Sequence, residues 1–159
     1  MREIQESTYL YDDLEDEKLK KRIKNSLNWF IKKAVVYKRC YYTFSSTSII
    51  TPLALTIMNS VESSTFMANN FKQYSAILAT ITTVATSLLA LFRFKDQWQE
   101  YRETAEILKS ELMKYQMKTG DYEQQDIQKL CDRVEAIIAQ SNLDQMRIVD
   151  EAEMEKTEK

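Results

Sequence analysis

The chain has 159 residues, a net charge of −2 and 29% charged residues, so it is long enough for one domain and has no cationic excess that would favour nucleic acid. It contains one Gly, one Pro and no His, and this shortage of helix breakers predicts an all-α fold of long helices. The lack of His removes the commonest metal ligand and general base, and the sequence contains no nucleophile–base pair, phosphate-binding loop or metal-ligand cluster. We therefore predict a protein that is not an enzyme and has no catalytic residue, cofactor or metal.

The first predicted element is a cytoplasmic N-terminal helix over residues 1–39. Its apolar residues recur at alternating intervals of four and three, and this spacing continues to residue 41. Such spacing is typical of a helix with a coiled-coil-like seam. The residues on this seam are Ile23, Leu27, Phe30, Ala34, Tyr37 and Tyr41.

Residues 40–61 and 73–92 contain no charged side chain. As helices of 22 and 20 residues, both are long enough to cross roughly 30 Å of hydrocarbon. In the alternative, a small soluble bundle, each helix should present a charged face to water. We therefore predict two membrane-spanning helices, 40–61 and 73–92, joined by an outer loop over 62–72. The first is only weakly hydrophobic and is expected to rely on its neighbours.

Basic residues lie at one end of each predicted span. Lys38 and Arg39 precede the first span, and Arg93 and Lys95 follow the second. The connecting loop has a single basic residue. Because basic residues concentrate on the cytoplasmic side, the pattern predicts a multi-pass protein with both termini in the cytoplasm.

The second predicted span has a stripe of small residues. Small side chains let helices approach closely, so we expect this stripe to face protein rather than lipid. Its members are Ala76, Thr80, Thr83, Ser87 and Ala90.

Residues 93–119 are predicted as a cytoplasmic extension of the second span. Their apolar seam consists of Phe94, Trp98, Tyr101, Ala105, Leu108, Leu112 and Tyr115. We expect this extension to pack against the N-terminal helix as an antiparallel hairpin. With Arg39 level with Arg93, partners have numbers that sum to about 132, which pairs Lys21 with Glu111 and Lys32 with Glu100.

The segment KTGDYEQQD predicts a break before a third cytoplasmic helix over 121–149. Gly120 is expected at the left-handed position after the preceding helix, and Asp121 as the N-cap of the next one. The apolar seam of the third helix consists of Ile127, Leu130, Val134, Ile137 and Ser141. Residues 150–159 form a charged tail, and the whole chain is expected to be a single domain.

The segment from residue 98 to 122 resembles the pattern after the second span in the SLATT family, the SMODS- and SLOG-associating two-transmembrane domains. The matching residues are Trp98, Tyr101, Arg102, Glu106, Leu108, Lys109, Glu111, Tyr115, Gly120 and Tyr122, with Trp29, Phe30, Ala34 and Tyr42 upstream. The resemblance covers most of residues 15–140. It implies a membrane-perforating or channel-like effector of bacterial defence, acting beside a separate sensor or nucleotide-signalling protein.

Hydroxyl side chains recur every four residues on both predicted spans. One interpretation is local, with each hydroxyl bonding a carbonyl of its own helix or a neighbouring helix. The other is a wettable stripe that lines a pore when several hairpins assemble. The candidate pore-lining residues are Thr43, Thr47, Thr51, Thr82 and Thr86.

Three further candidates have a structural and a functional interpretation. Pro52 is a gating hinge or a static kink. Glu62 is a charge at the outer mouth of a pore or a solvated loop residue. Arg102 and Glu106, four residues apart, are a ligand contact or a structural ion pair.

We therefore expect an oligomeric membrane pore, built from several copies of this chain in the lipid bilayer of a bacterial inner membrane. The alternative is a membrane-anchored coiled-coil scaffold that recruits a soluble partner and conducts nothing.

Overall fold

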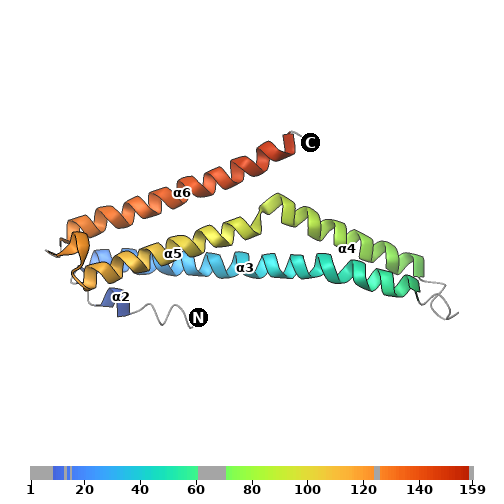
Figure 1. Cartoon of the computed structure of the whole chain (residues 1–159), viewed down its shortest axis with the longest axis horizontal. Helices are drawn as coiled ribbons and strands as arrows, with labels where there is room; N and C mark the ends of the chain where they lie inside the picture. The colour runs from blue at the N-terminus through green and yellow to red at the C-terminus, as the bar shows by residue number, and fades with distance from the viewer. Residues whose placement is uncertain (1–8, 13, 15, 61–70, 124–125, 158–159) are drawn as a thin grey trace. The chain divides into compact units, whose positions relative to one another are not determined.

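A computed structural model describes residues 9–12, 14, 16–60, 71–123 and 126–157. Within these ranges the chain is helical and contains no strand, which confirms the all-α fold (Figure 1). The elements in chain order are α2 (Tyr9–Asp12), α3 (Glu17–Ser60), α4 (Phe71–Phe92), α5 (Phe94–Gln116), the 3-10 turn η1 (Gly120–Tyr122) and α6 (Ile127–Thr157).

The chain divides into two compact units. Unit 1 comprises Met1–Tyr37 with Lys95–Lys159, and unit 2 comprises Lys38–Phe94. The sequence predicts a change from cytoplasm to membrane after residue 39 and from membrane to cytoplasm after residue 92. The chain passes from unit 1 to unit 2 after residue 37 and back to unit 1 after residue 94. Unit 2 therefore nearly coincides with the segment predicted for the membrane, although we expected a single domain.

Aspartate side chains cap the N-termini of α3 and α6. The backbone N–H groups of Lys18 and Leu19 donate to Asp16 Oδ1, at 2.8 and 3.2 Å. At the start of α6 the N–H of Gln128 donates to Asp126 Oδ1 at 2.9 Å. These are N-cap bonds, which satisfy amides that have no partner within the helix. The N-cap of the third helix is therefore Asp126, and the prediction of Asp121 is wrong.

The C-terminus of α5 also differs from the prediction. The N–H of Thr119 donates to the Lys114 carbonyl at 3.1 Å, and the N–H of Lys118 donates to the Tyr115 carbonyl at 3.2 Å. This is a Schellman motif with Lys118 at its left-handed position, at φ 53°. Gly120, expected there, is also left-handed at φ 63° but opens the following 3-10 turn instead.

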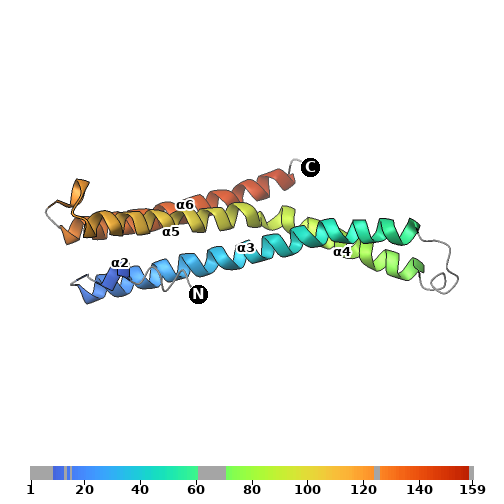
Figure 2. The same ribbon diagram turned by 60° about the horizontal axis from the view of Figure 1, so that its bottom comes forward.

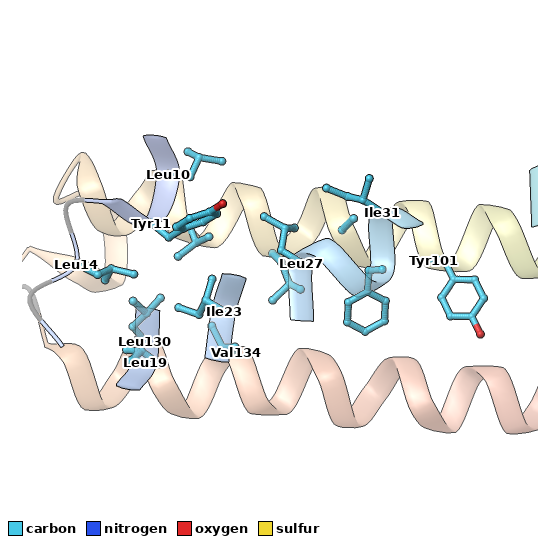
Figure 3. Close-up of a cluster of buried hydrophobic side chains, with 14 of the residues drawn as sticks. Leu10, Tyr11, Leu14, Leu19, Ile23, Leu27, Ile31, Tyr101, Leu130 and Val134 are labelled. Atoms are coloured by element: carbon cyan, nitrogen blue, oxygen red, sulfur yellow. The ribbon is translucent and has the colours of Figure 1, made fainter. Parts of the chain in front are cut away.

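The predicted apolar seams form the core of unit 1 (Figure 3). α3, α5 and α6 each contribute the residues that their four-three spacing predicts. Those buried are Ile23, Leu27, Phe30, Ala34, Tyr101, Ala105, Leu108, Leu112, Leu130 and Val134. The seam residues at the edge of this core are partly buried: Tyr37, Tyr115, Ile127 and Ile137. The spacing thus identified the packing faces of all three helices.

The short helix α2 completes this core and was not predicted. Leu10, Tyr11 and Leu14 are each at most 7% exposed and belong to the same cluster (Figure 3). The acidic residues around them hid this apolar patch from the sequence pattern.

The register of α3 against α5 is close to that predicted. Leu27 and Ala105, whose numbers sum to 132, are both fully buried, and the rings of Trp29 and Tyr101 lie 5.5 Å apart. The expected ion pair of Lys21 with Glu111 does not form, because Glu111 instead binds Lys114 at 2.7 Å.

In unit 2, α3 and α4 lie side by side near their connection in both views (Figures 1 and 2). The rings of Phe44 and Phe94 stack at 5.7 Å. The small-residue stripe of α4 is exposed in a single copy of the chain, so it is not the face that packs on α3. The least exposed residue of α4 is instead Ala85, and the half-buried residues of this helix are Ser75, Leu78, Thr82, Leu88 and Leu89.

Candidate functional site

The segment Gln73–Phe92 of α4 is long and apolar enough to cross a membrane, with a mean hydropathy of 1.9 over 20 residues. Only 6% of it is buried, so it is not the core helix of unit 2. An exposed apolar surface of this length is unfavourable in water and is expected to be covered by lipid or by other protein chains.

The part of α3 predicted as the first span is less apolar. In the described part of the chain, α4 alone is both long enough and apolar enough to cross a membrane. The reason lies in the composition of residues 40–61, where eight residues are Ser or Thr. Four large apolar side chains of this segment are nevertheless exposed: Ile49 65%, Ile50 63%, Leu53 63% and Ile57 58%.

Most of the candidate pore-lining threonines donate to carbonyls of their own helix. Thr47 donates to the Thr43 carbonyl at 2.9 Å, and Thr51 donates to that of Thr47. On α4, Thr82 and Thr86 donate to the carbonyls four residues earlier, both at 3.0 Å. In one copy of the chain these hydroxyls therefore make the local bonds of the first interpretation.

These threonines also differ in exposure, although they were predicted as one stripe. Thr43 and Thr86 are exposed, Thr47 and Thr82 are half-buried, and Thr51 is 7% exposed. The two exposed hydroxyls are the candidates best placed to meet water.

Pro52 lies inside α3, which continues through it to Ser60. The carbonyl of Pro52 accepts a bond from the Thr56 hydroxyl at 2.9 Å. Glu62, the candidate outer-mouth charge, lies outside the described residues.

An aromatic cluster joins several of the family-motif residues in unit 1. The ring of Tyr101 contacts those of Trp29, Phe30 and Tyr37, with centroids 5.4 to 6.3 Å apart. The Tyr101 hydroxyl donates to Gln145 Oε1 at 3.0 Å, which links α5 to α6. Burial, together with the nearby Tyr37, raises the pKa of Tyr101 to about 12, so its hydroxyl keeps its proton at neutral pH.

Arg102 and Glu106 form an ion pair at 2.8 Å on the surface of α5, and Glu106 also binds Lys109 at 3.2 Å. Both members of the first pair are nearly half exposed, so the pair stabilises the helix by only about 0.3–0.5 kcal/mol. This geometry favours the structural interpretation. Trp98, on the same helix, is half-buried.

A buried carboxylate connects the end of α5 to the 3-10 turn. Glu111 is 7% exposed, and its two oxygens accept bonds from Lys114 at 2.7 Å and from the Tyr122 hydroxyl at 3.0 Å. Burial would raise the pKa of Glu111, but the bonds from Lys114 and Tyr122 together outweigh it and hold the pKa below its usual value. The Tyr122 ring also contacts that of Tyr115 at 5.7 Å. These motif residues thus fasten the turn to α5.

Sequence reasoning did not find a groove between α5 and α6. Its volume is about 380 Å³, and it is lined by residues of these two helices alone. Its floor includes the Thr104 and Ser141 hydroxyls, both buried and 3.0 Å apart. The acidic residues of the lining come from separate parts of the sequence, so only the register of α5 against α6 could have revealed it.

The chain therefore combines one helical unit that has an apolar core with a second unit that contains α4, which is long and apolar enough to cross a membrane. It belongs to the DUF4231 family, described as proteins of unknown function, whose family model matches residues 25–129. The matched region includes α4, α5 and most of α3. No curated protein and no solved structure matches the chain.

Proposed function

We propose that this chain is a SLATT-type effector that crosses a bacterial inner membrane twice and assembles into a pore. The observation that carries the proposal is α4, an apolar helix of membrane-spanning length that is almost entirely exposed. A surface of this kind is stable in hydrocarbon, where every backbone polar group must be paired within a helix.

The first span rests on a second observation. Ile49, Ile50, Leu53 and Ile57 are the residues of α3 that would contact lipid, since each is more than half exposed. Its Ser and Thr hydroxyls make insertion less favourable, but bonds to carbonyls of the same helix reduce that cost. The partner helix α4 supplies the neighbour on which a weakly apolar span depends.

The exposed threonines are the proposed wettable positions. A hydroxyl that donates to its own helix still has lone pairs that accept a bond from water. Thr43 and Thr86 would line the pore when several copies surround it, because two helices cannot enclose an aqueous path.

Dye release from liposomes tests this function. We expect the wild-type protein to release dye, and Thr86→Val to slow release about fivefold, since one lost hydroxyl–water bond is worth about 1 kcal/mol. Thr80→Val is the matched control, because Thr80 is also exposed and donates to its own helix, at 2.8 Å, but is not one of the candidate pore-lining residues. Equal release by both variants would contradict the assignment of Thr86 to the pore.

A non-conducting scaffold is the second candidate. It is favoured by the local bonds that hold the hydroxyls of Thr47, Thr51 and Thr82, which need no water. In this function unit 1 recruits a soluble protein, such as a sensor, to the membrane. Intact liposomes in the presence of every candidate activator would favour the scaffold over the pore.

A further inference from the structure

The groove between α5 and α6 is acidic. Four carboxylates line it, those of Glu100, Glu103, Glu111 and Asp144, against the single guanidinium of Arg133. Glu111 is already neutralised by Lys114, as described above. The negative charge that remains is concentrated where Glu100, Glu103 and Asp144 lie together.

This negative charge is poorly compensated within the chain. Burial, Asp144 and Glu103 all raise the pKa of Glu100 above its usual value. Asp144 forms an ion pair only with Arg147 in the described part of the chain, at 3.6 Å, and the Arg147 side chain is 71% exposed. A cation that entered the groove would therefore reduce the repulsion between these carboxylates. An anion such as a nucleotide phosphate would be repelled.

A basic surface lies on another part of the same unit. Lys21, Lys24 and Lys32 are exposed on α3, whose opposite side carries the buried residues of the core. In the described part of the chain, no ion pair joins these three lysines to an acidic residue. We call them the lysine face.

We propose that the α5–α6 groove of one copy binds the lysine face of a second copy. The inference rests on the proposed homo-oligomer and names the contact that builds it. The argument is charge complementarity: exposed lysines of one helix meet a group of carboxylates of which only Asp144 has an ion pair in the described part of the chain, with the exposed Arg147. The Lys side chain also suits the groove, because its apolar stem can pack on Ile107 and Ile137 while its ammonium group reaches the carboxylates.

The geometry of this contact is suited to a ring. The groove is lined by α5 and α6 alone, whereas the lysine face lies on α3, so the two surfaces share no residue. A contact between two different surfaces is heterologous, and it leaves one free surface of each kind on every pair. Further copies can therefore add, and they form a ring, as a pore requires, when the rotation between copies closes. A self-complementary dimer contact would stop at two.

Paired charge reversals test this contact in the full-length protein in detergent. The first variant carries Lys21→Glu, Lys24→Glu and Lys32→Glu, and the second carries Glu100→Lys, Glu103→Lys and Asp144→Lys. We expect either variant alone to assemble at least about tenfold more weakly by native mass spectrometry, because like charges then meet. We expect an equimolar mixture, and a single chain that carries all six changes, to recover assembly.

Charge reversal outside both surfaces is the control. Asp132 and Lys118 are exposed and lie in neither surface, so Asp132→Lys with Lys118→Glu should leave assembly unchanged. Circular dichroism establishes that each variant is folded. If a triple variant does not fold, the wild-type oligomer is titrated with salt instead, and we expect it to weaken as ionic strength rises.

The outcomes separate this inference from the proposed function. Oligomers that resist the reversals and the salt while liposomes still leak would overturn the contact but leave the pore. Oligomers that depend on these charges but never conduct would support the contact and overturn the pore. Recovery of either triple variant by an unrelated acidic or basic protein, and not by its complement, would show that the partner is not a second copy.

Discussion

Val84→Lys is expected to abolish stable membrane insertion of the protein. Val84 lies near the middle of Gln73–Phe92 and is 52% exposed, so in the proposed topology its side chain is in contact with hydrocarbon. A Lys at the centre of a membrane helix costs about 2.5–3.5 kcal/mol on insertion scales. We expect the variant to be extracted from membranes by alkaline carbonate while the wild-type protein remains in the pellet.

Val149→Lys is the matched control for this change. Val149 is also a helical valine, 48% exposed, but it lies on α6 in unit 1. In water this substitution is expected to change stability by no more than about 0.5 kcal/mol. The control variant should therefore stay in the pellet. Equal extraction of both variants, or of neither, would contradict a lipid environment that is confined to unit 2.

Tyr122→Phe is expected to destabilise unit 1 and to make it more sensitive to acid. The change removes one of the two bonds that Glu111 accepts, and leaves a buried carboxylate oxygen without its partner. A loss of this kind costs about 1–3 kcal/mol. Denaturant unfolding in detergent, followed by far-UV circular dichroism, measures it.

The pH dependence follows from the sign of the Glu111 shift. Because the folded-state pKa is lowered, the stabilisation is present above the unfolded-state pKa and is lost as the pH falls through the folded-state value. Without the Tyr122 bond the pKa of Glu111 rises, so we expect the variant to lose stability at a higher pH than the wild type. Tyr9→Phe is the control, because Tyr9 is 57% exposed. If Tyr122→Phe and Tyr9→Phe unfolded alike at every pH, the bond to Glu111 would contribute nothing.

The helices and their packing faces could be predicted because both depend on local periodicity. The four-three spacing of Leu27, Ala105 and Leu130 requires only that each helix have one apolar side, and all three are fully buried. The packing face of α4 was not predicted, since small size alone suggested Ala76 and Thr83. The helix instead packs through Thr82 and Ala85. Where every face is apolar or hydroxylated, periodicity alone does not select one.

The end of α5 was harder to predict because two nearby residues, Lys118 and Gly120, could each take the left-handed cap position. Gly120 has the lowest cost in the left-handed conformation, yet Lys118 takes the cap position despite a penalty of about 1–2 kcal/mol. The position of the cap is set by where α5 stops packing, and Tyr122 two residues beyond Gly120 is held by Glu111. A local glycine signal cannot include that long-range contact.

The candidate sites could be predicted only where they depend on residues close together in the sequence. The ion pair of Arg102 with Glu106 lies within one helix turn and follows from spacing. The acidic groove does not, since Glu100 and Asp144 are 44 residues apart in the sequence and meet only through the register of α5 and α6.

The central claim is that residues 40–61 and 73–92 both cross the membrane, so that the loop between them lies on the opposite side from unit 1. Labelling of single cysteines with a membrane-impermeant maleimide tests it most directly. Cys131 is exposed on α6 and serves as the reporter for unit 1 in a Cys40→Ser background. Glu62→Cys, with both native cysteines replaced by Ser, is the reporter for the loop. We predict that Glu62→Cys is labelled from outside intact spheroplasts and Cys131 only after the membrane is opened. Labelling of both reporters from the same side would contradict the two-span topology.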